Sequence, residues 1–195
     1  MTEALALADP MLSFQTDRQR AKEANDPMAA VCVLATVDAA GLPQARTLVL
    51  RDVAEGLAIY INASSPKWLQ SQNVVAIQTW WPSVQIQYRM HAVGRELSSN
   101  HVAQSWLRRP DAPKHMDWLY EQTPQSSPVG SRADLLALLD LAEHPQPLVA
   151  PPGARGLLLR PQTIERLDLN QTDGVHDRKR FVLEADRWRQ ETLVP

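Results

Sequence analysis

The residues best suited to binding or chemistry lie in two neighbouring segments, Arg46-Thr-Leu-Val-Leu-Arg51 and Ile59-Tyr-Ile-Asn-Ala-Ser-Ser-Pro-Lys67. Both carry cations, and arginine and lysine are the side chains that bind phosphate in proteins. In an extended strand Arg46 shares one face with two leucines, whereas Arg51 lies on the opposite face. A cation on an apolar face, close to a Ser-Ser-Pro-Lys turn, is compatible with a phosphate cradle. The alternative is a pair of solvated arginines at the two ends of a strand, and this segment alone favours that alternative.

Other classes of site find less support in the sequence. The histidines, His91, His101, His115, His144 and His176, lack zinc-motif spacing, and a single cysteine adds no second ligand. The chain has no Gly-rich phosphate loop and no Gly-x-Ser-x-Gly nucleophile turn. Further cations and an amide do stand on or near predicted strands, namely Gln87, Arg89 and Arg178. The sequence therefore favours anion binding, with no metal and no hydrolase chemistry.

Composition is that of an ordinary globular domain. The chain has 195 residues, with 22% charged and 44% hydrophobic residues, which suits a single domain over residues 1–195. The formal net charge of −2 gives no support for a nucleic-acid partner, so any anion site must be local.

Three features favour a cytoplasmic location. Cys32 lies in an apolar run and is expected to be a buried core thiol, with no partner for an internal disulfide. The segment Met1-Thr-Glu-Ala-Leu5 has no basic region before its apolar residues and is unlike a secretory signal. No apolar stretch is long enough to span a bilayer, so we expect no membrane partner.

The apolar pattern predicts strands that follow one another in hairpins. Val31 to Val37 is rich in β-branched residues, and Gly41 supplies the positive φ that a turn to the return strand needs. The predicted strands cover residues 31–37, 44–50, 56–61, 74–80, 84–97 and 156–169, with a hairpin near 180–183 and 187–193. Sequential hairpins predict an antiparallel sheet closed as a barrel, with helices packed outside.

Four helices are predicted around this sheet. The first occupies residues 11–25 of an N-terminal segment, 1–25, and the others cover 65–72, 98–108 and 132–142. Ser65 is the expected N-cap of the second, with Pro66 in its first turn. Prolines make residues 143–155 an extended connection. Trp80 and Trp81 are expected to pack in the barrel or an interface rather than to stack on a cofactor.

In their order and spacing these motifs resemble the pyridoxamine 5′-phosphate oxidase family, whose members fold as FMN-binding split barrels. The resemblance runs from about Ala30 to Pro195. It is carried by Ala35 to Gly41, Arg46 to Arg51, Tyr60-Ile-Asn62 with Lys67, Gln87-Tyr-Arg89, Arg108-Arg-Pro110, Gln125-Ser-Ser127, His176-Asp-Arg178 and Trp188 to Pro195. The resemblance implies a mainly β fold with helices, an antiparallel split β-barrel with peripheral helices.

The resemblance also implies FMN as the cofactor. The matching positions are Arg46, Thr47, Leu48, Val49, Leu50, Arg51, Tyr60, Ile61, Lys67, Gln87, Gln125, Ser126 and Arg178. Arg46 and Lys67 match phosphate-binding residues, and Gln122-Thr123 is an ungapped alternative to Gln125-Ser126. Two positions depart from the family. Pro66 occupies the position where the family usually has a second cation, and Leu167 the position of a flavin-contacting tryptophan.

The substrate positions are less well kept. Arg51, Arg109 and His176 match substrate-binding residues, although Arg51 replaces a lysine. Ser105, Pro113 and Gly174 replace a tyrosine, a serine and an arginine. The resemblance thus implies an FMN-dependent oxidoreductase with an altered substrate site, working as a homodimer in which both chains line the flavin. The alternative is a flavin- or ligand-binding protein without turnover. The sequence identifies neither the substrate nor the catalytic residues.

Overall fold

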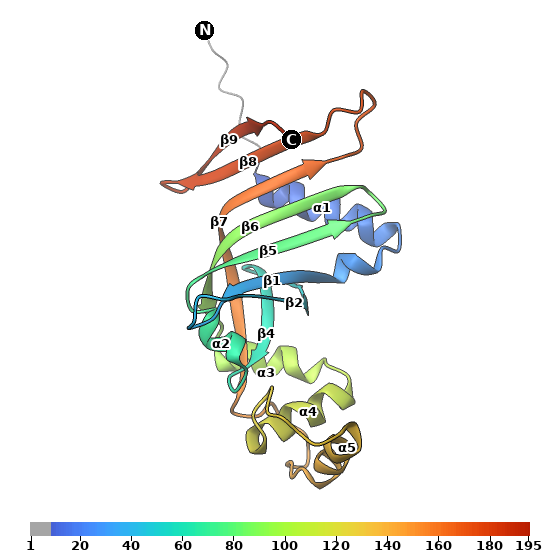
Figure 1. The fold of residues 1–195 in the computed structure, drawn as a ribbon, viewed down its shortest axis with the longest axis vertical. Coiled ribbons are helices and arrows are strands. Elements are labelled where there is room, and N and C mark those ends of the chain that lie inside the picture. The colour runs from blue at the N-terminus through green and yellow to red at the C-terminus, as the bar shows by residue number, and fades with distance from the viewer. Residues whose placement is uncertain (1–8) are drawn as a thin grey trace.

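Nine strands form one antiparallel sheet in the part of the chain that the computed structural model describes, residues 9–195. Residues 1–8, which include the start of the predicted N-terminal segment and the Met1–Leu5 stretch, lie outside the described residues. The strands are β1 (Val31–Val37), β2 (Pro43–Val49), β3 (Arg51–Val53), β4 (Gly56–Asn62), β5 (Val74–Trp81), β6 (Ile86–Glu96), β7 (Ala154–Asp168), β8 (Asp177–Glu184) and β9 (Arg187–Leu193). Figure 1 shows the strongly curved sheet, with β8 and β9 at one end.

The sheet returns to its own beginning. Its order is β2-β1-β5-β6-β7-β4-β3, with β8 and β9 continuing from β7. The first and last strands of this path, β2 and β3, are separated in the chain by Leu50 alone. The curved path therefore encloses the core, and its two ends meet through one buried residue, which is 2% exposed. This confirms the predicted antiparallel split-barrel fold, although β2 and β3 do not pair with each other, so the described sheet is open rather than closed as the hairpin pattern predicted.

Alternation of apolar residues explains the strands. In β1, buried residues such as Cys32 and Leu34 alternate with half-buried ones, and β5 repeats the pattern. Arg46 of β2 pairs with Leu34 of β1 and lies on the half-buried face, as the alternation predicts. Hairpin turns use positive φ, for example at Gly41 (80°) after β1 and at the Ala185–Asp186 pair (46° and 63°) between β8 and β9.

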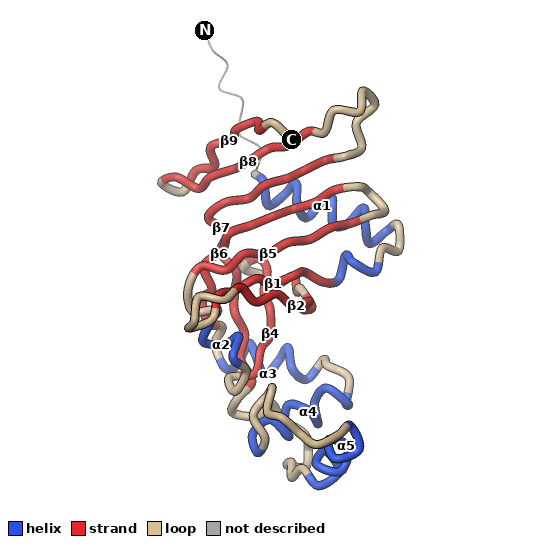
Figure 2. Tube along the Cα trace, in the orientation of Figure 1, coloured by secondary structure: helices blue, strands red, loops and turns tan. Residues whose placement is uncertain are grey.

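Helix α1 (Pro10–Glu23) crosses one face of the sheet. Phe14 packs against Trp81 of β5 and Tyr88 of β6, with ring centroids 5.2 and 5.0 Å away. Trp81 is fully buried, which confirms that it is a packing residue. The short 3₁₀ helix η1 (Pro27–Ala30) then leads into β1. This arrangement, drawn by element type in Figure 2, fixes the start of β1 against the helix.

The remaining helices, apart from the short α2 (Pro66–Gln70) after β4, gather at the opposite end of the sheet from β8 and β9 (Figure 1). They are α3 (Ser99–Leu107), α4 (Asp111–Gln122) and α5 (Arg132–Leu141). Ser98 and Ser131 cap α3 and α5 through hydrogen bonds from backbone N–H groups. Helix α4 was not predicted, because Pro110 and Pro113 indicate a break. Pro113 instead lies in the first turn, where a missing N–H costs nothing.

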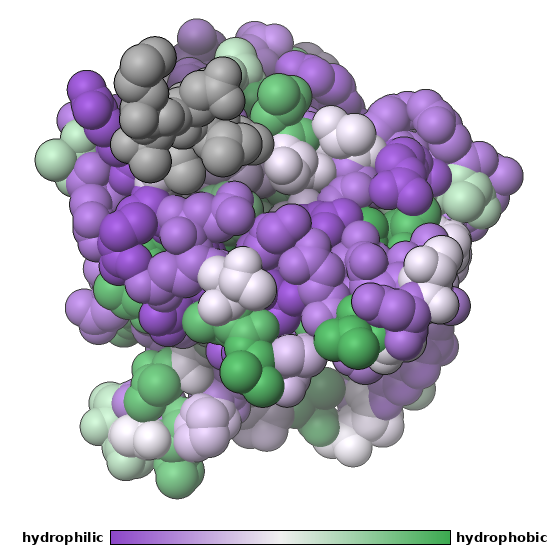
Figure 3. Space-filling view, turned by 90° about the horizontal axis from the view of Figure 1, so that it is seen from above, coloured by the Kyte–Doolittle hydropathy of each residue, from purple (hydrophilic) through white to green (hydrophobic). Residues whose placement is uncertain are grey.

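The surface at the β8–β9 end is mostly hydrophilic. Figure 3, seen from above, shows apolar side chains there only in small separate groups, outside the grey atoms. None of the helices within residues 9–195 has the length and apolar composition needed to cross a membrane.

Candidate functional site

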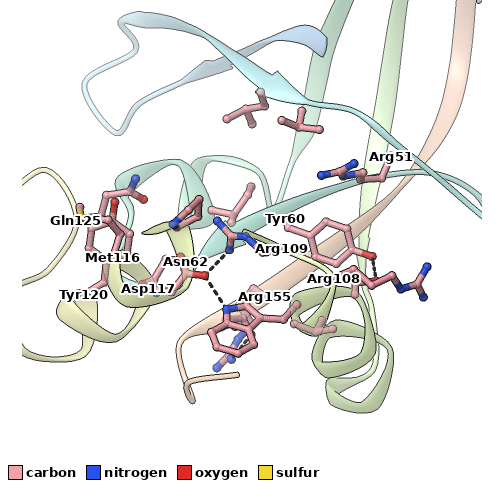
Figure 4. Close-up of a pocket in the computed structure, with 18 of the residues that line it drawn as sticks. Arg51, Tyr60, Asn62, Arg108, Arg109, Met116, Asp117, Tyr120, Gln125 and Arg155 are labelled. Carbon is pink, nitrogen blue, oxygen red and sulfur yellow. Dashed lines mark hydrogen bonds and ion pairs between the residues drawn. The ribbon is translucent and has the colours of Figure 1, made fainter. Parts of the chain in front are cut away.

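A cleft of about 1090 Å³ lies between the strand ends of the barrel and the helical layer. The sheet side comprises Thr47, Leu48, Val49, Arg51, Tyr60, Ile61 and Asn62, with Lys67 of α2 beside them. The opposite side comprises residues of α3 and α4, including Ser105, Trp106, Arg109, Pro113, Met116, Asp117 and Tyr120, together with Gln125. Figure 4 shows these two sets of side chains pointing towards a shared space. The cleft therefore brings together residues more than seventy positions apart in the sequence.

Arg46 lies behind the cleft rather than on its lining. Its guanidinium donates to the hydroxyl of Thr36 at 2.6 Å and to Oε1 of Gln70 at 3.1 Å. Lys67 does line the cleft, and its ammonium donates to Ser65 Oγ at 2.6 Å and to Gln125 Oε1 at 3.0 Å. Both cations thus have neutral partners, and neither forms an ion pair with a carboxylate of residues 9–195.

Burial makes these two cations electrostatically unusual. It lowers the pKa of Lys67, and the positive charge of Arg46 lowers it further. Burial also lowers the pKa of Arg46. Two partly desolvated cations that act on one another and lack a counter-charge create a local positive potential. Such a site suits a phosphate group, so the donor set fits the cofactor that the sequence predicted.

Gln125 is held at the cleft by the loop after α4. Its backbone N–H donates to Ser64 Oγ at 3.0 Å, and its side-chain oxygen accepts from Lys67. Gln122 instead donates to the carbonyl of Glu143 at 3.5 Å, on the exposed side of α4. Of the two alternatives left open by the sequence, Gln125 lies on the cleft and Gln122 does not. Ser126 is exposed, has a positive φ of 76° and is not part of the lining.

The helical side of the cleft is organised around Asp117. Its carboxylate accepts from Trp106 Nε1 at 2.7 Å and pairs with Arg109. Burial raises the pKa of Asp117, and the charge of Arg109 opposes that rise. Across the cleft, the hydroxyls of Tyr60 and Ser105 are 2.6 Å apart (Figure 4). Arg109 and Ser105 therefore already have partners within the chain.

A second, smaller pocket of about 150 Å³ contains the other predicted site residues. It is lined by Gln87, Arg89, Glu165, Leu167, His176, Arg178 and Pro195. Arg178 donates to Glu165 Oε2 at 2.8 Å, and Arg89 lies 3.9 Å from the same oxygen. Burial alone would raise the pKa of Glu165, but the hydrogen bond from Arg178 and the nearby arginine charges lower it. We call this group the sheet pocket.

The predicted site residues thus divide between two places on one chain. The cleft holds Thr47, Leu48, Val49, Arg51, Tyr60, Ile61, Lys67, Arg109 and Gln125, whereas the sheet pocket holds Gln87, His176 and Arg178. Leu50 is buried at the bend between β2 and β3. The predicted positions do not form a single site within one chain.

Sequence reasoning missed several cleft residues. Asn62, Trp106, Met116, Asp117 and Tyr120 all line the cleft. Four belong to the helical side, and the signal that was available is the spacing of Met116, Leu119 and Tyr120, which is typical of one helix face. As for metals, the described residues contain no group of His, Cys, Asp or Glu side chains arranged to hold an ion.

Comparisons with known proteins confirm the resemblance. No family model matches the chain. It is 29% identical to the pyridoxine/pyridoxamine 5′-phosphate oxidase of Haemophilus influenzae, over 96% of this chain and 90% of that protein. The enzyme of the same name from Anaeromyxobacter dehalogenans is also 29% identical, over 97% of both chains.

Solved structures agree on the fold. The crystal structure of PhzG from Burkholderia lata, in complex with tetrahydrophenazine-1-carboxylic acid, has a TM-score of 0.81 at 20% identity, covering 98% of this chain and 95% of that one. A pyridoxamine 5′-phosphate oxidase-related, FMN-binding protein from Nostoc punctiforme has a TM-score of 0.76 at 23% identity, covering 98% and 100%. These likenesses establish the fold that the sequence predicted.

Proposed function

We propose that this chain, which is similar over its whole length to pyridoxine/pyridoxamine 5′-phosphate oxidases, binds FMN in the cleft as one domain and acts as an FMN-dependent oxidoreductase in the cytoplasm. The observation that carries the proposal is the pair formed by Arg46 and Lys67. Both are partly buried, and both bond only to neutral groups among residues 9–195. The strand end Tyr60-Ile61, beside them, offers an edge along which a flavin ring can lie.

When bound, FMN supplies an acceptor for a hydride from the substrate. The chain itself would bind and orient FMN and the substrate. Lys67, with Arg46 behind it, would hold the phosphate, and Gln125 would offer its amide to the ring. Arg51, which matches both a cofactor and a substrate position, would contact FMN from the sheet side. Together with Arg109 on the opposite side of the cleft, it would also hold an anionic group of the substrate. The apolar side chains of Pro113 and Met116 would exclude water from the helical side.

Two copies of the chain would complete each site. Gln87, His176 and Arg178 match the same family site as the cleft residues but lie in the sheet pocket. A homodimer in which the sheet pocket of one copy faces the cleft of the other brings all of them to one flavin. We propose this shared site, and it makes the assembly testable through the cofactor.

The first experiment measures cofactor preference. Fluorescence quenching is recorded for FMN and for riboflavin, which lacks the phosphate that Lys67 and Arg46 are proposed to hold. We expect FMN to bind at least about tenfold more tightly, because a charged hydrogen bond contributes about 1.5–3 kcal/mol. Equal affinities would contradict the assignment.

The second experiment tests the shared site with mixed dimers. One copy carries Lys67→Ala in the cleft, and the other carries Arg178→Glu in the sheet pocket. If sites are shared, one site per mixed dimer carries both changes and the other carries neither, so half of the sites bind FMN with wild-type affinity. The Arg178→Glu homodimer is measured alongside: if sites are shared, all of its sites lose affinity, whereas if each cleft binds FMN without the partner, all of them keep wild-type affinity. Light scattering at micromolar concentration checks that the species measured is a dimer.

An alternative proposal is a flavin-binding protein without turnover. The altered substrate positions favour it, because Ser105 is bonded to Tyr60 and Pro113 donates no hydrogen bond. The discriminating measurement is the absorbance of bound flavin during a ligand screen: reduction by a candidate and reoxidation by oxygen support the enzyme. The screen includes tetrahydrophenazine-1-carboxylic acid, the ligand of PhzG, because Pro113, Met116 and Leu139 give the cleft an apolar wall.

A further inference from the structure

We propose that Arg18 of α1 is a positioning residue for the cleft: it fixes the bend at Leu50, and through it the direction of Arg51 and Asp52 on the cleft wall. This inference rests on the proposed function, since it assigns Arg18 to the same ligand site. Arg18 lies 33 positions before Arg51 in the sequence and does not line the cleft itself.

Arg18 is almost fully buried, at 3% exposure, and each part of its guanidinium has a partner. Its Nε donates to the carbonyl of Ala29, its NH1 to Oδ1 of Asp52 and its NH2 to the carbonyl of Leu50, all at 2.7 Å. A planar guanidinium with three short bonds holds these groups in one fixed arrangement. Lys22, one turn further along α1, reaches the other oxygen of Asp52 at 3.0 Å.

The bend at Leu50 needs this support. Leu50 is the single residue between β2 and β3, so the regular ladder is interrupted there. Its N–H donates to the carbonyl of Ala30 at 3.0 Å, and its buried carbonyl accepts from Arg18. Without Arg18 the buried carbonyl of Leu50 would lose this hydrogen bond, and a buried carbonyl without a hydrogen bond disfavours this backbone conformation.

The bend decides which groups face the cleft. Arg51 and Asp52 immediately follow Leu50, pair with Ala58 and Leu57 of β4, and line the cleft. Arg51 lies above Tyr60 in Figure 4, on the side of the cleft that faces the helices. Arg18 bonds to the carbonyl of Leu50, just before Arg51, and to the side chain of Asp52, just after it. A change at Arg18 therefore alters the placement of Arg51.

The neighbouring residue offers a matched control. Asp17 is also buried, at 5% exposure, and it also anchors α1 to the sheet. Its carboxylate accepts from Tyr88 at 2.7 Å and from Arg166 at 2.8 Å, and neither of these partners lines the cleft. Asp17→Asn therefore weakens the anchoring of α1 without touching the bend, whereas Arg18→Met removes the contacts at the bend.

The test compares Arg18→Met, Asp17→Asn and the wild type by FMN fluorescence quenching, urea unfolding and hydrogen exchange of the amides of residues 50–53. We expect both variants to lose stability. Only Arg18→Met should bind FMN about tenfold more weakly and exchange faster at residues 50–53. The double variant Arg18→Met/Arg51→Met should bind FMN no more weakly than Arg51→Met alone, because both changes remove the same contact.

Three results would overturn the proposal: FMN affinity of Arg18→Met within about twofold of wild type, an equal loss of affinity in Asp17→Asn, or fully additive effects in the double variant. If Arg18→Met does not fold, Arg18→Lys, which keeps the charge but not the fork, is judged by the same criteria. If wild-type protein binds no FMN, the proposed function fails. Hydrogen exchange at residues 50–53 in Arg18→Met and Asp17→Asn then still decides whether Arg18 holds the bend.

Discussion

The cleft and the sheet pocket both contain cations, but only at the cleft are there cations whose hydrogen bonds all go to neutral groups. In the cleft, Lys67 and the adjacent Arg46 bond to hydroxyls, amides and carbonyls. In the sheet pocket, Arg178 forms an ion pair with Glu165 at 2.8 Å. A cation without a carboxylate partner gains most from a bound phosphate dianion, whereas a paired one has already been neutralised.

The same contrast divides the cleft itself. Arg109, on the helical side, is paired with Asp117, while Lys67 on the sheet side is not. The predicted phosphate positions Arg46 and Lys67 are therefore unpaired, whereas the predicted substrate position Arg109 and the predicted cofactor position Arg178 are paired. This difference indicates a strong site for a phosphate at the sheet side and a weaker site for a second, highly charged group.

The largest expected effect concerns vitamin B6 phosphates as substrates. Arg109 is paired, Ser105 is bonded to Tyr60, and Pro113 and Gly174 offer no side-chain donor. A loss of about 1 kcal/mol per neutral contact over the three replaced positions amounts to roughly a hundredfold in kcat/KM.

The measurement is steady-state kinetics of flavin-loaded protein with pyridoxamine and pyridoxine phosphates. We expect kcat/KM below about 10⁴ M⁻¹s⁻¹, the lower end of the ordinary enzyme range. A value at or above that level would mean that the paired cations still bind a dianion well, and the comparison between the two sides of the cleft would no longer hold.

A second prediction compares the unpaired and the paired cations directly. Lys67→Ala should weaken FMN binding by about tenfold to a hundredfold, since it removes a charged contact worth about 1.5–3 kcal/mol. Arg178→Ala should weaken it less, by about threefold, because Glu165 already neutralises that charge. Isothermal titration of both variants against FMN decides the order, and a larger loss in Arg178→Ala would reverse the comparison.

A third prediction uses the lowered pKa of Lys67. A bound phosphate favours the charged ammonium, so the pKa of Lys67 is higher in the complex than in the free protein. FMN affinity should be at its full value below the free-protein pKa and should fall, by up to about tenfold per pH unit, as the pH rises above it. Titrations over the alkaline range test this, with Lys67→Met and riboflavin as controls that should respond much less. An equal alkaline loss in Lys67→Met would assign the titration to another group.

The smallest expected effect separates two glutamines, Gln122 at the end of α4 and Gln125 in the loop that follows it. Gln125→Ala should weaken FMN binding by about twofold to tenfold, the range for a neutral hydrogen bond. Gln122→Ala is the matched control and should leave affinity unchanged, because its side chain bonds to Glu143 away from the cleft. The opposite order would show that the ungapped match was the better one.

The sequence predicted the strands well and the helical layer poorly, for identifiable reasons. Runs rich in β-branched residues, such as Val31 to Val37, indicate a strand directly. Helix α4 begins with Asp111-Ala-Pro113, and proline there reads as a break unless its place in the first turn is known. Because α4 was missed, so was Asp117, the residue that pairs with Arg109.

Other features depend on contacts between distant residues. The position of Arg18 against Leu50 and Asp52 leaves no local pattern, since a buried arginine on α1 looks like a solvated one until the sheet is placed. Likewise, the resemblance gave the residues of the site but not their division between cleft and sheet pocket. Spatial separation is a property of the folded sheet rather than of sequence spacing.

Cys32 gives this protein a built-in chemical reporter. Its thiol is 2% exposed, burial raises its pKa to about 12, and its strand neighbour across the ladder is Leu48 of the cleft wall. A thiol-specific dye can therefore react only when the core around Cys32 opens to solvent, so the labelling rate measures how often this part of the barrel opens. A ligand that binds the closed form alone slows labelling by the factor 1 + [L]/Kd. The affinity of a colourless ligand can then be read from the kinetics of one cysteine.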